Sequence, residues 1–182
     1  MAREDIVQDN RRETQIARIV GLKPSEKRAG RDATDLHSNS FELKSATKKG
    51  VTTARDVGVQ TIAKWRKTYW VVATGLIKAG KFKIDSIYVA HPDDLEPWFA
   101  QLEKTLLEEE RVCDKVLKAA AKAGAAKDDI LFVRKKCERG ITRNNPKIPL
   151  RRFQDHCFKL DHTNSKAAQK QLAEFVRNHP LN

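Results

Sequence analysis

The chain has 182 residues, a size that fits one domain with a single hydrophobic core. Its hydrophobic content of 40% and charged content of 33% indicate a soluble globular protein, and no apolar stretch is long enough to cross a bilayer. The formal net charge of +12 favours a polyanionic partner such as nucleic acid, although basic ribosomal and membrane-surface proteins share this property.

The N-terminal residues and the cysteines bear on cellular location. The opening segment, MAREDIVQDNRRE, has no apolar run after its first charges, so we expect no secretory signal and a cytoplasmic location. The three cysteines, Cys113, Cys137 and Cys157, are widely spaced and form no CxxC motif. We expect reduced thiols rather than a disulfide framework.

The first part of the chain predicts a helix, a hairpin and a second helix. Apolar spacing predicts a helix over residues 5–22, which Gly21 and Pro24 would end. Two short strands are expected near residues 32–36 and 40–46, joined by His-Ser-Asn. A helix is expected around residues 59–66, with Asp56 as its N-cap.

The middle of the chain predicts a second hairpin. The run YWVVATGLI at residues 69–77 is continuously apolar, which is typical of a central strand. Residues 82–90 alternate in polarity and would pair with that strand through a turn at Ala-Gly-Lys.

The second half of the chain is predominantly helical in pattern. Apolar spacing predicts a long helix from about residue 92, and a second helix that ends at Gly140. The Ala/Lys-rich stretch 118–127 between them is expected to be either a helical arm or a connector. Residues 144–150, NNPKIPL, are expected to be an irregular turn, and residues 165–178 a final helix. The predicted order indicates an α/β fold with a mixed sheet flanked by helices.

Asp32, Glu42 and Lys44 form the pattern that carries chemistry. In a strand, Glu42 and Lys44 point to the same face, and the predicted hairpin brings Asp32 opposite Glu42. Two carboxylates that hold Mg²⁺, with a lysine beside them, are what metal-dependent phosphodiester hydrolysis requires. Leu43 would point to the core, and its carbonyl would be a further metal ligand. The alternative is a solvated ion pair of little energetic weight.

Several segments together resemble one nuclease family. The stretches DIVQDN, GRDATD, FELKS, TTARD, IAKWR and RNNPKIP appear in this order and resemble the PvuII-type restriction endonucleases of the PD-(D/E)xK nuclease superfamily, from about residue 5 to 156. The resemblance implies a restriction-endonuclease-like mixed sheet in a single nuclease domain, 1–182, with a helical insert at about 101–140. It also implies a prokaryotic type II restriction endonuclease, a homodimer that uses Mg²⁺ to cut both strands of a short palindromic DNA site.

The resemblance assigns roles to individual residues. Asp32 and Glu42 match the metal-binding acids, Lys44 matches the catalytic lysine, and Leu43 lies where a main-chain carbonyl contacts metal. The residues expected to contact double-stranded DNA are Asp9 near the minor groove, Thr52, Arg55 and Asp56 in the recognition segment, the base-reading pair Asn144 and Asn145, and Lys147. Further phosphate contacts are expected collectively from Lys48, Lys49, Lys64, Arg66, Arg151 and Arg152.

Arg55 and Asp56 replace part of a histidine run in the family. Arg can bond guanine O6 and N7, and Asp can accept from cytosine N4, so the target sequence is expected to differ. A local Arg55–Asp56 salt bridge is the alternative. Because the N-terminal segment that the family uses for dimerisation is absent from this sequence, we expect a different interface, built from helix 5–22 or the insert.

Two other functions stay open at this level. A structure-selective repair or junction nuclease of the same superfamily would share the three active-site residues. A non-catalytic DNA-binding module would share the fold, although an intact set of Asp32, Glu42 and Lys44 argues against it.

Overall fold

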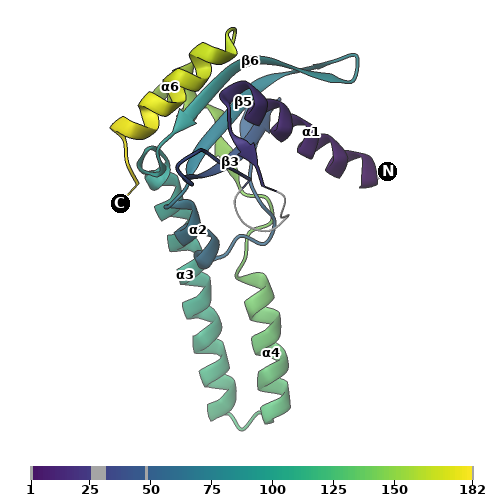
Figure 1. The fold of residues 1–182 in the computed structure, drawn as a ribbon. Coiled ribbons are helices and arrows are strands. Elements are labelled where there is room, and N and C mark those ends of the chain that lie inside the picture. Colours follow the sequence, from purple (N-terminus) through teal and green to yellow (C-terminus); the bar gives the residue numbers. More distant parts are fainter. Residues whose placement is uncertain (1, 26–31, 48, 182) are drawn as a thin grey trace.

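The structure is a computed structural model that describes residues 2–25, 32–47 and 49–181, and within it the side chains of residues 2–10 and 138–140 are not described. One mixed sheet forms the centre of the molecule, with strand order β1-β2-β3-β5-β6-β8 (Figure 1). β3 and β5 are parallel, and the other neighbours in this sheet are antiparallel. The strands are β1 (Lys23–Pro24), β2 (Ala33–Thr34), β3 (Ser40–Ala46), β5 (Tyr69–Lys78), β6 (Lys81–Ala90) and β8 (Phe158–Leu160).

Helices cover both faces of this sheet. One face packs against α1 (Ala2–Val20) and α6 (Ser165–Asn178), and the other packs against α2 (Val59–Trp65), α3 (Pro92–Lys122) and α5 (Leu150–His156). The expected α/β fold, a mixed sheet flanked by helices, is confirmed. No helix within the described residues has both the length and the apolar character of a membrane span.

Two cores result from the alternation of side chains along β3. Phe41 and Leu43 are fully buried against α1 and α6, whereas Ala46 packs with the helices of the opposite face. Glu42 and Lys44 therefore lie on the α2–α3 face of the sheet, while Leu43 points into the core as predicted. The apolar run of β5 pairs with β3 on one side and β6 on the other, so its prediction as a central strand is confirmed.

The β5–β6 hairpin bends at Gly75. The strand register shifts between Thr74 and Gly75, which marks a β-bulge. A Cβ atom at Gly75 would lie 2.0 Å from the carbonyl oxygen of Lys83, so only glycine allows the strands to approach this closely. The turn itself has positive φ at Ala79 (49°) and Gly80 (72°), as a tight hairpin turn requires.

α3 and α4 (Lys127–Gly140) lie side by side and extend away from the sheet (Figure 1). α3 continues without a break to Lys122, and Gly124, with φ of 82°, lies in the turn that leads into α4. Of the two expectations for residues 118–127, the helical arm is therefore correct.

Two local predictions were wrong. Residues 144–150 are not wholly irregular, because β7 (Lys147–Pro149) pairs antiparallel with β4 (Gly50–Thr52) in a second, two-stranded sheet. Asp56 does not cap α2, which begins after Gly58, with no side-chain cap bond. Asp56 instead has φ of 50°, in the turn that precedes the helix.

Candidate active site

The β2–β3 pairing brings Asp32 beside Glu42. Ala33 pairs with Phe41, and the Asp32 amide donates to the Phe41 carbonyl at 3.1 Å, so Asp32 lies against β3 next to Glu42. The Leu43 amide donates to Asp32 Oδ2 at 2.9 Å, which fixes the carboxylate beside β3. The predicted meeting of these two acids across a hairpin is observed.

Lys44 Nζ lies between the two carboxylates. It is 2.9 Å from Asp32 Oδ2 and 2.9 Å from Glu42 Oε1. The Lys44 and Glu42 side chains are only 14% and 8% exposed, so this is a largely buried charge cluster and not the solvated surface pair of the alternative interpretation. A buried ion pair is not in itself a strong source of stability, which makes a chemical role the better reason for this arrangement.

Burial and charge shift the pKa values of this cluster. Burial raises the pKa of Glu42, and the Asp32 carboxylate raises it further, although Lys44 acts in the opposite direction. For Lys44, burial alone would lower the pKa, but the charges of Glu42, Asp32 and Glu13 outweigh it and the pKa is raised. Lys44 is therefore a fixed positive charge at any physiological pH.

The two carboxylates suit a divalent cation. Asp32 and Glu42 direct one oxygen each at the same cationic group, here the Lys44 ammonium. In a β-strand the N–H and C=O of one residue point to the same side, so the Leu43 carbonyl faces the same side as its amide, toward Asp32. Mg²⁺ commonly binds one or two carboxylates and completes its shell with water and substrate phosphate. Among the described residues, no group of three or more His, Cys, Asp or Glu side chains is arranged to hold a metal ion.

Glu13 is a member of the cluster that sequence reasoning missed. Its Oε1 lies 3.6 Å from Lys44 Nζ, and its side chain is 27% exposed. The sequence places Glu13 in the first helix, but nothing in the pattern indicates that α1 approaches β3 there. The neighbouring Arg12 and Gln15 both contact Phe82 of β6, which anchors this part of α1.

The second sheet assembles most of the predicted DNA-contact residues. Thr52 pairs directly with Lys147, and the Asn145 amide donates to the Ala54 carbonyl at 3.1 Å. Thr53 donates to the Pro146 carbonyl through its amide at 3.2 Å and through its hydroxyl at 2.6 Å. Residues 50–57 and 143–149, which are far apart in the sequence, thus form one continuous surface.

The side chains on that surface are available to solvent. Asn144, Lys147, Arg55 and Asp56 are exposed. Asn145 has φ of 51° and donates from Nδ2 to Asn144 Oδ1 at 3.0 Å, so the two amides are held together as a pair. No ion pair joins Arg55 to Asp56 in the described part of the chain, so the local salt bridge is not formed.

Other predicted contacts lie elsewhere or outside the description. The Asp9 side chain and Lys48 are outside the described residues, although the Asp9 backbone lies in α1. The Arg66 guanidinium is 2.8 Å from both Glu96 and Glu103, so Arg66 forms ion pairs within the protein. Asp35 accepts from the amides of His37 and Asn39, so it stabilises the β2–β3 turn and does not join the acidic cluster.

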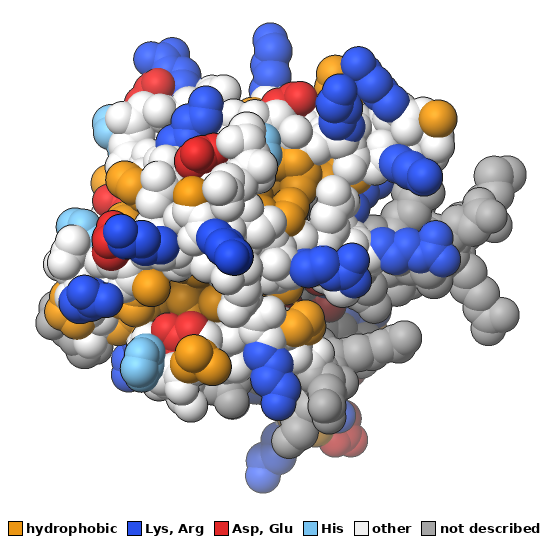
Figure 2. Space-filling model, turned by 45° about the horizontal axis from the view of Figure 1, so that its top comes forward, with side chains coloured by type: hydrophobic (Ala, Val, Ile, Leu, Met, Phe, Trp, Pro, Cys, Tyr) orange, Lys and Arg blue, Asp and Glu red, His pale blue; other side chains and the backbone are white. Residues whose placement is uncertain are grey.

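On the face that Figure 2 shows, positive charge is spread rather than collected at one place. Figure 2 shows lysine and arginine side chains scattered over the face in view, with fewer acidic ones. Basicity alone therefore does not locate the DNA surface, and the pairing of β4 with β7 is the better guide.

A cavity of about 500 Å³ lies apart from the active-site cluster. It is bounded by the end of α1, the β2–β3 turn and α6, with Leu22, Leu36, Leu172 and Val176 in its walls. None of Asp32, Glu42 and Lys44 lines it. Chemistry, and not cavity size, identifies the candidate active site.

Comparison with protein families agrees with this geometry. The model of the family described as "Restriction endonuclease PvuII" matches residues 2–118. The matched region contains α1, the β2–β3 pair with Asp32, Glu42 and Lys44, and the β5–β6 hairpin. The match spans well over half of the chain, and its members are site-specific deoxyribonucleases that are generally dependent on divalent metals. The chain therefore belongs to the PvuII restriction endonuclease family and is a type II restriction endonuclease.

Proposed function

We propose that the enzyme hydrolyses both strands of a short palindromic DNA site as a homodimer, with Mg²⁺ as its cofactor. One observation carries this proposal: Lys44 Nζ is 2.9 Å from Asp32 Oδ2, just before β2, and 2.9 Å from Glu42 Oε1, on β3. Two acids that share a cationic partner, with a lysine on the same face, are suited to hydrolysis of a phosphodiester.

Each residue of the cluster would have a separate role. The Asp32 and Glu42 carboxylates and the Leu43 carbonyl would hold Mg²⁺. When bound, Mg²⁺ neutralises charge on the scissile phosphate and lowers the pKa of a bound water. Lys44 would donate hydrogen bonds to the attacking water and to a phosphate oxygen, because its ammonium remains charged. Glu13 would keep Lys44 in place once Asp32 and Glu42 are engaged.

Sequence recognition would come from the surface that β4 and β7 form. The paired amides of Asn144 and Asn145 suit an adenine, which offers N6 and N7 to one amide. Arg55 and Asp56 would read a G·C pair, and Thr52 and Lys147 would contact the adjacent backbone. Asp9 would lie near the minor groove.

A two-fold DNA site favours a two-fold protein, which supports a homodimer for cleavage. We also propose that residues 1–182 form a single nuclease domain with residues 101–140 as an insert. The shared central sheet supports one domain, because both cores pack against its two faces.

Digestion of plasmid or phage DNA with the purified protein and Mg²⁺ tests this function. We expect discrete fragments, and sequencing their ends would give both the site and the cut position. The variant Asp32→Asn/Glu42→Gln is the matched control and should leave the DNA intact. Cleavage confined to branched substrates would instead indicate a repair or junction nuclease, and binding without cleavage would indicate a non-catalytic module.

A further inference from the structure

The second half of α3 and all of α4 form an antiparallel two-helix arm, residues 107–140, that extends from the sheet (Figure 1). Leu117 is buried, and Cys113 of α3 lies close enough to Cys137 of α4 that the neighbouring thiol raises the pKa of Cys113. At the base of the arm, Arg143 Nη1 donates to Glu109 Oε2 at 2.8 Å, and its Nη2 donates to Glu109 Oε1. These contacts hold the two helices together as one unit.

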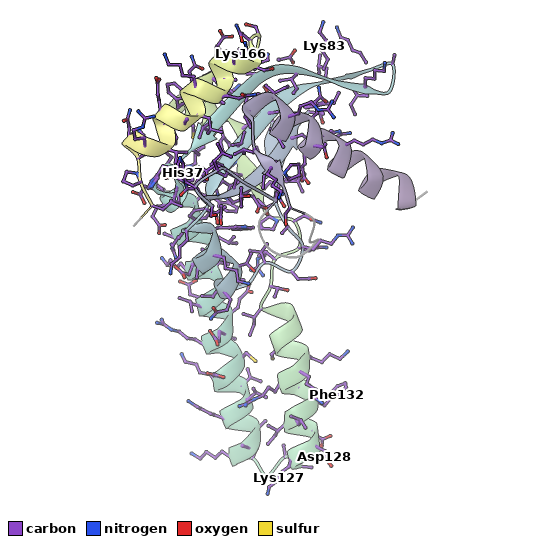
Figure 3. The ribbon with its side chains drawn as sticks, in the orientation of Figure 1. His37, Lys83, Lys127, Asp128, Phe132 and Lys166 are labelled. Carbon is purple, nitrogen blue, oxygen red and sulfur yellow. The ribbon has the colours of Figure 1, made fainter. Side chains whose placement is uncertain are left out.

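The outer face of α4 carries apolar side chains that are largely exposed among the described residues. Residues three and four apart share a face of a helix, and this spacing separates the outer face from the side that packs on α3. Leu131 is 50% exposed and Phe132 is 62% exposed. Figure 3 shows Phe132 and Asp128 projecting from the side of α4 that faces away from α3. We define the outer face of α4 by its members Asp128, Asp129, Leu131, Phe132, Lys135 and Lys136.

Charge is arranged on this face with acid at one end and base at the other. Asp128 and Asp129 precede Phe132 by about one turn, and Lys135 and Lys136 follow it by about one turn. The Lys136 Nζ lies 5.4 Å from the centre of the Phe132 ring. Within the described part of the chain, these four charged residues make no ion pair. Their charges are therefore free to meet a partner.

The helix is complementary to a second copy of itself in the antiparallel direction. With the two Phe132 residues at the centre, Asp128 of one copy faces Lys136 of the partner subunit, and Asp129 faces Lys135 of the partner subunit. A parallel arrangement would instead place acid beside acid and base beside base. DNA fits this face poorly, because the two aspartates would repel phosphate.

We propose that the outer face of α4 is a self-association surface, at which two arms pack antiparallel across a two-fold axis near Phe132. The apolar centre would be buried, and the oppositely charged ends would pair around it, as in a coiled-coil interface. The contact buries the exposed Leu131 and Phe132 of both copies at once.

This contact differs from the dimer that would cut one palindrome. Eight residues of α4, about 12 Å of helix, separate Phe132 from Gly140 beside the sheet. In an antiparallel pair of arms, the two catalytic bodies therefore lie at opposite ends. The arms would join units that bind separate DNA segments, or would link two cleavage dimers into a tetramer.

Sedimentation velocity of the free protein, over a range of concentrations and without DNA or Mg²⁺, tests the proposal. The variants Asp128→Lys/Asp129→Lys and Lys135→Asp/Lys136→Asp each make the ends of the outer face alike in charge. We expect each alone to weaken self-association by about tenfold or more, and an equimolar mixture to restore it, because the two altered faces complement each other. Phe132→Ser should weaken it by a similar factor.

Val112→Ser is the matched control, because Val112 is also on the arm and 61% exposed but lies on α3. It should leave sedimentation unchanged, and circular dichroism should show that all variants remain helical. The proposal is overturned if the wild type and the charge variants sediment alike, if the mixture does not restore association, or if Val112→Ser acts like Phe132→Ser. Loss of DNA binding by Lys135→Asp/Lys136→Asp, with unchanged association of the free protein, would also overturn it and assign the face to DNA. Since no DNA is present in the main measurement, failure here is separate from failure of the proposed cleavage.

Discussion

Lys44 Nζ lies 2.9 Å from Glu42 Oε1, and the two residues are separated by one position on β3. The strand itself creates this proximity, because alternate side chains share a face. Asp32, which directly precedes β2, adds the second carboxylate, so that one ammonium neutralises two carboxylates in a partly buried site.

Replacing Lys44 with Ala should remove most cleavage and little DNA binding. The variant loses the positive charge beside the scissile phosphate, and we expect the rate to fall by about 10²–10³-fold. Single-turnover cleavage and gel-shift binding on the same duplex would separate the two effects. Lys166→Ala, at an exposed position of α6, should cleave normally. Unchanged cleavage by Lys44→Ala would refute its role.

The cleavage rate should rise with pH through the raised pKa of Glu42. Burial raises this pKa, so Glu42 stays protonated to a higher pH than an ordinary glutamate, and only the ionised form attracts a cation. At subsaturating Mg²⁺, the acid limb of the pH–rate profile should therefore lie above the usual range of a glutamate. A rate that stays constant down to the ordinary glutamate pKa would contradict this assignment. DNA binding measured at each pH would exclude a general loss of affinity.

Glu13→Gln should slow cleavage through Lys44. Glu13 is 3.6 Å from Lys44 Nζ, and it would be the carboxylate left to position the lysine when Asp32 and Glu42 bind a cation. We expect a loss of about tenfold in single-turnover rate, with DNA affinity nearly unchanged, and partial recovery in Glu13→Asp. Glu174→Gln on α6 serves as the control. Equal rates for Glu13→Gln and the wild type would remove Glu13 from the site.

Asn144→Ala and Lys147→Ala should change DNA binding in two different ways. If Asn144 reads a base edge, its loss should reduce discrimination at one base pair by about 1–3 kcal/mol. Loss of a phosphate contact at Lys147 should weaken binding to all sequences and reduce the salt dependence by about one unit of slope. Binding titrations at several salt concentrations, on cognate and single-mismatch duplexes, distinguish the two. Identical behaviour of the two variants would contradict the division of roles.

Gly75→Ala should destabilise the fold strongly. A Cβ at this position would lie 2.0 Å from the carbonyl oxygen of Lys83, so the bulge in the β5–β6 hairpin must open. We expect the free energy of unfolding to fall by about 2–3 kcal/mol or more in urea titrations. Gly58→Ala is the matched control, because its added Cβ meets only Thr142 at 3.8 Å, and it should cost less than about 1 kcal/mol.

Local rules predicted the parts of the active site that short segments build. The alternation of Glu42, Leu43 and Lys44 on one strand, and the hairpin that brings Asp32 to Glu42, both follow from neighbours in sequence. The pairing of β4 with β7 does not follow from neighbours in sequence, because the two strands are far apart in the chain. In addition, Pro146 and Pro149 lie on either side of Ile148, and prolines at this spacing are typical of a turn. Tertiary contact made a strand where the local pattern favoured a turn.

Glu13 and Asp56 show two further limits of local reasoning. Helical spacing predicts that Glu13 lies in a helix, but its meeting with Lys44 depends on how α1 packs against the sheet. Asp56 is a good N-cap residue by type, yet α2 starts after Gly58, because Val57 first pairs with Arg143 in an isolated bridge. In both cases a contact with a distant segment decided the outcome.

We propose that Asp32 and Glu42 hold the divalent cation that cleavage requires. Anomalous scattering from a crystal soaked in Mn²⁺ tests this claim most directly. We predict a peak bound by both carboxylates beside the Leu43 carbonyl, and no such peak in Asp32→Asn/Glu42→Gln. A Mn²⁺ peak elsewhere, or none at these residues in protein that cleaves DNA with Mn²⁺, would contradict the account.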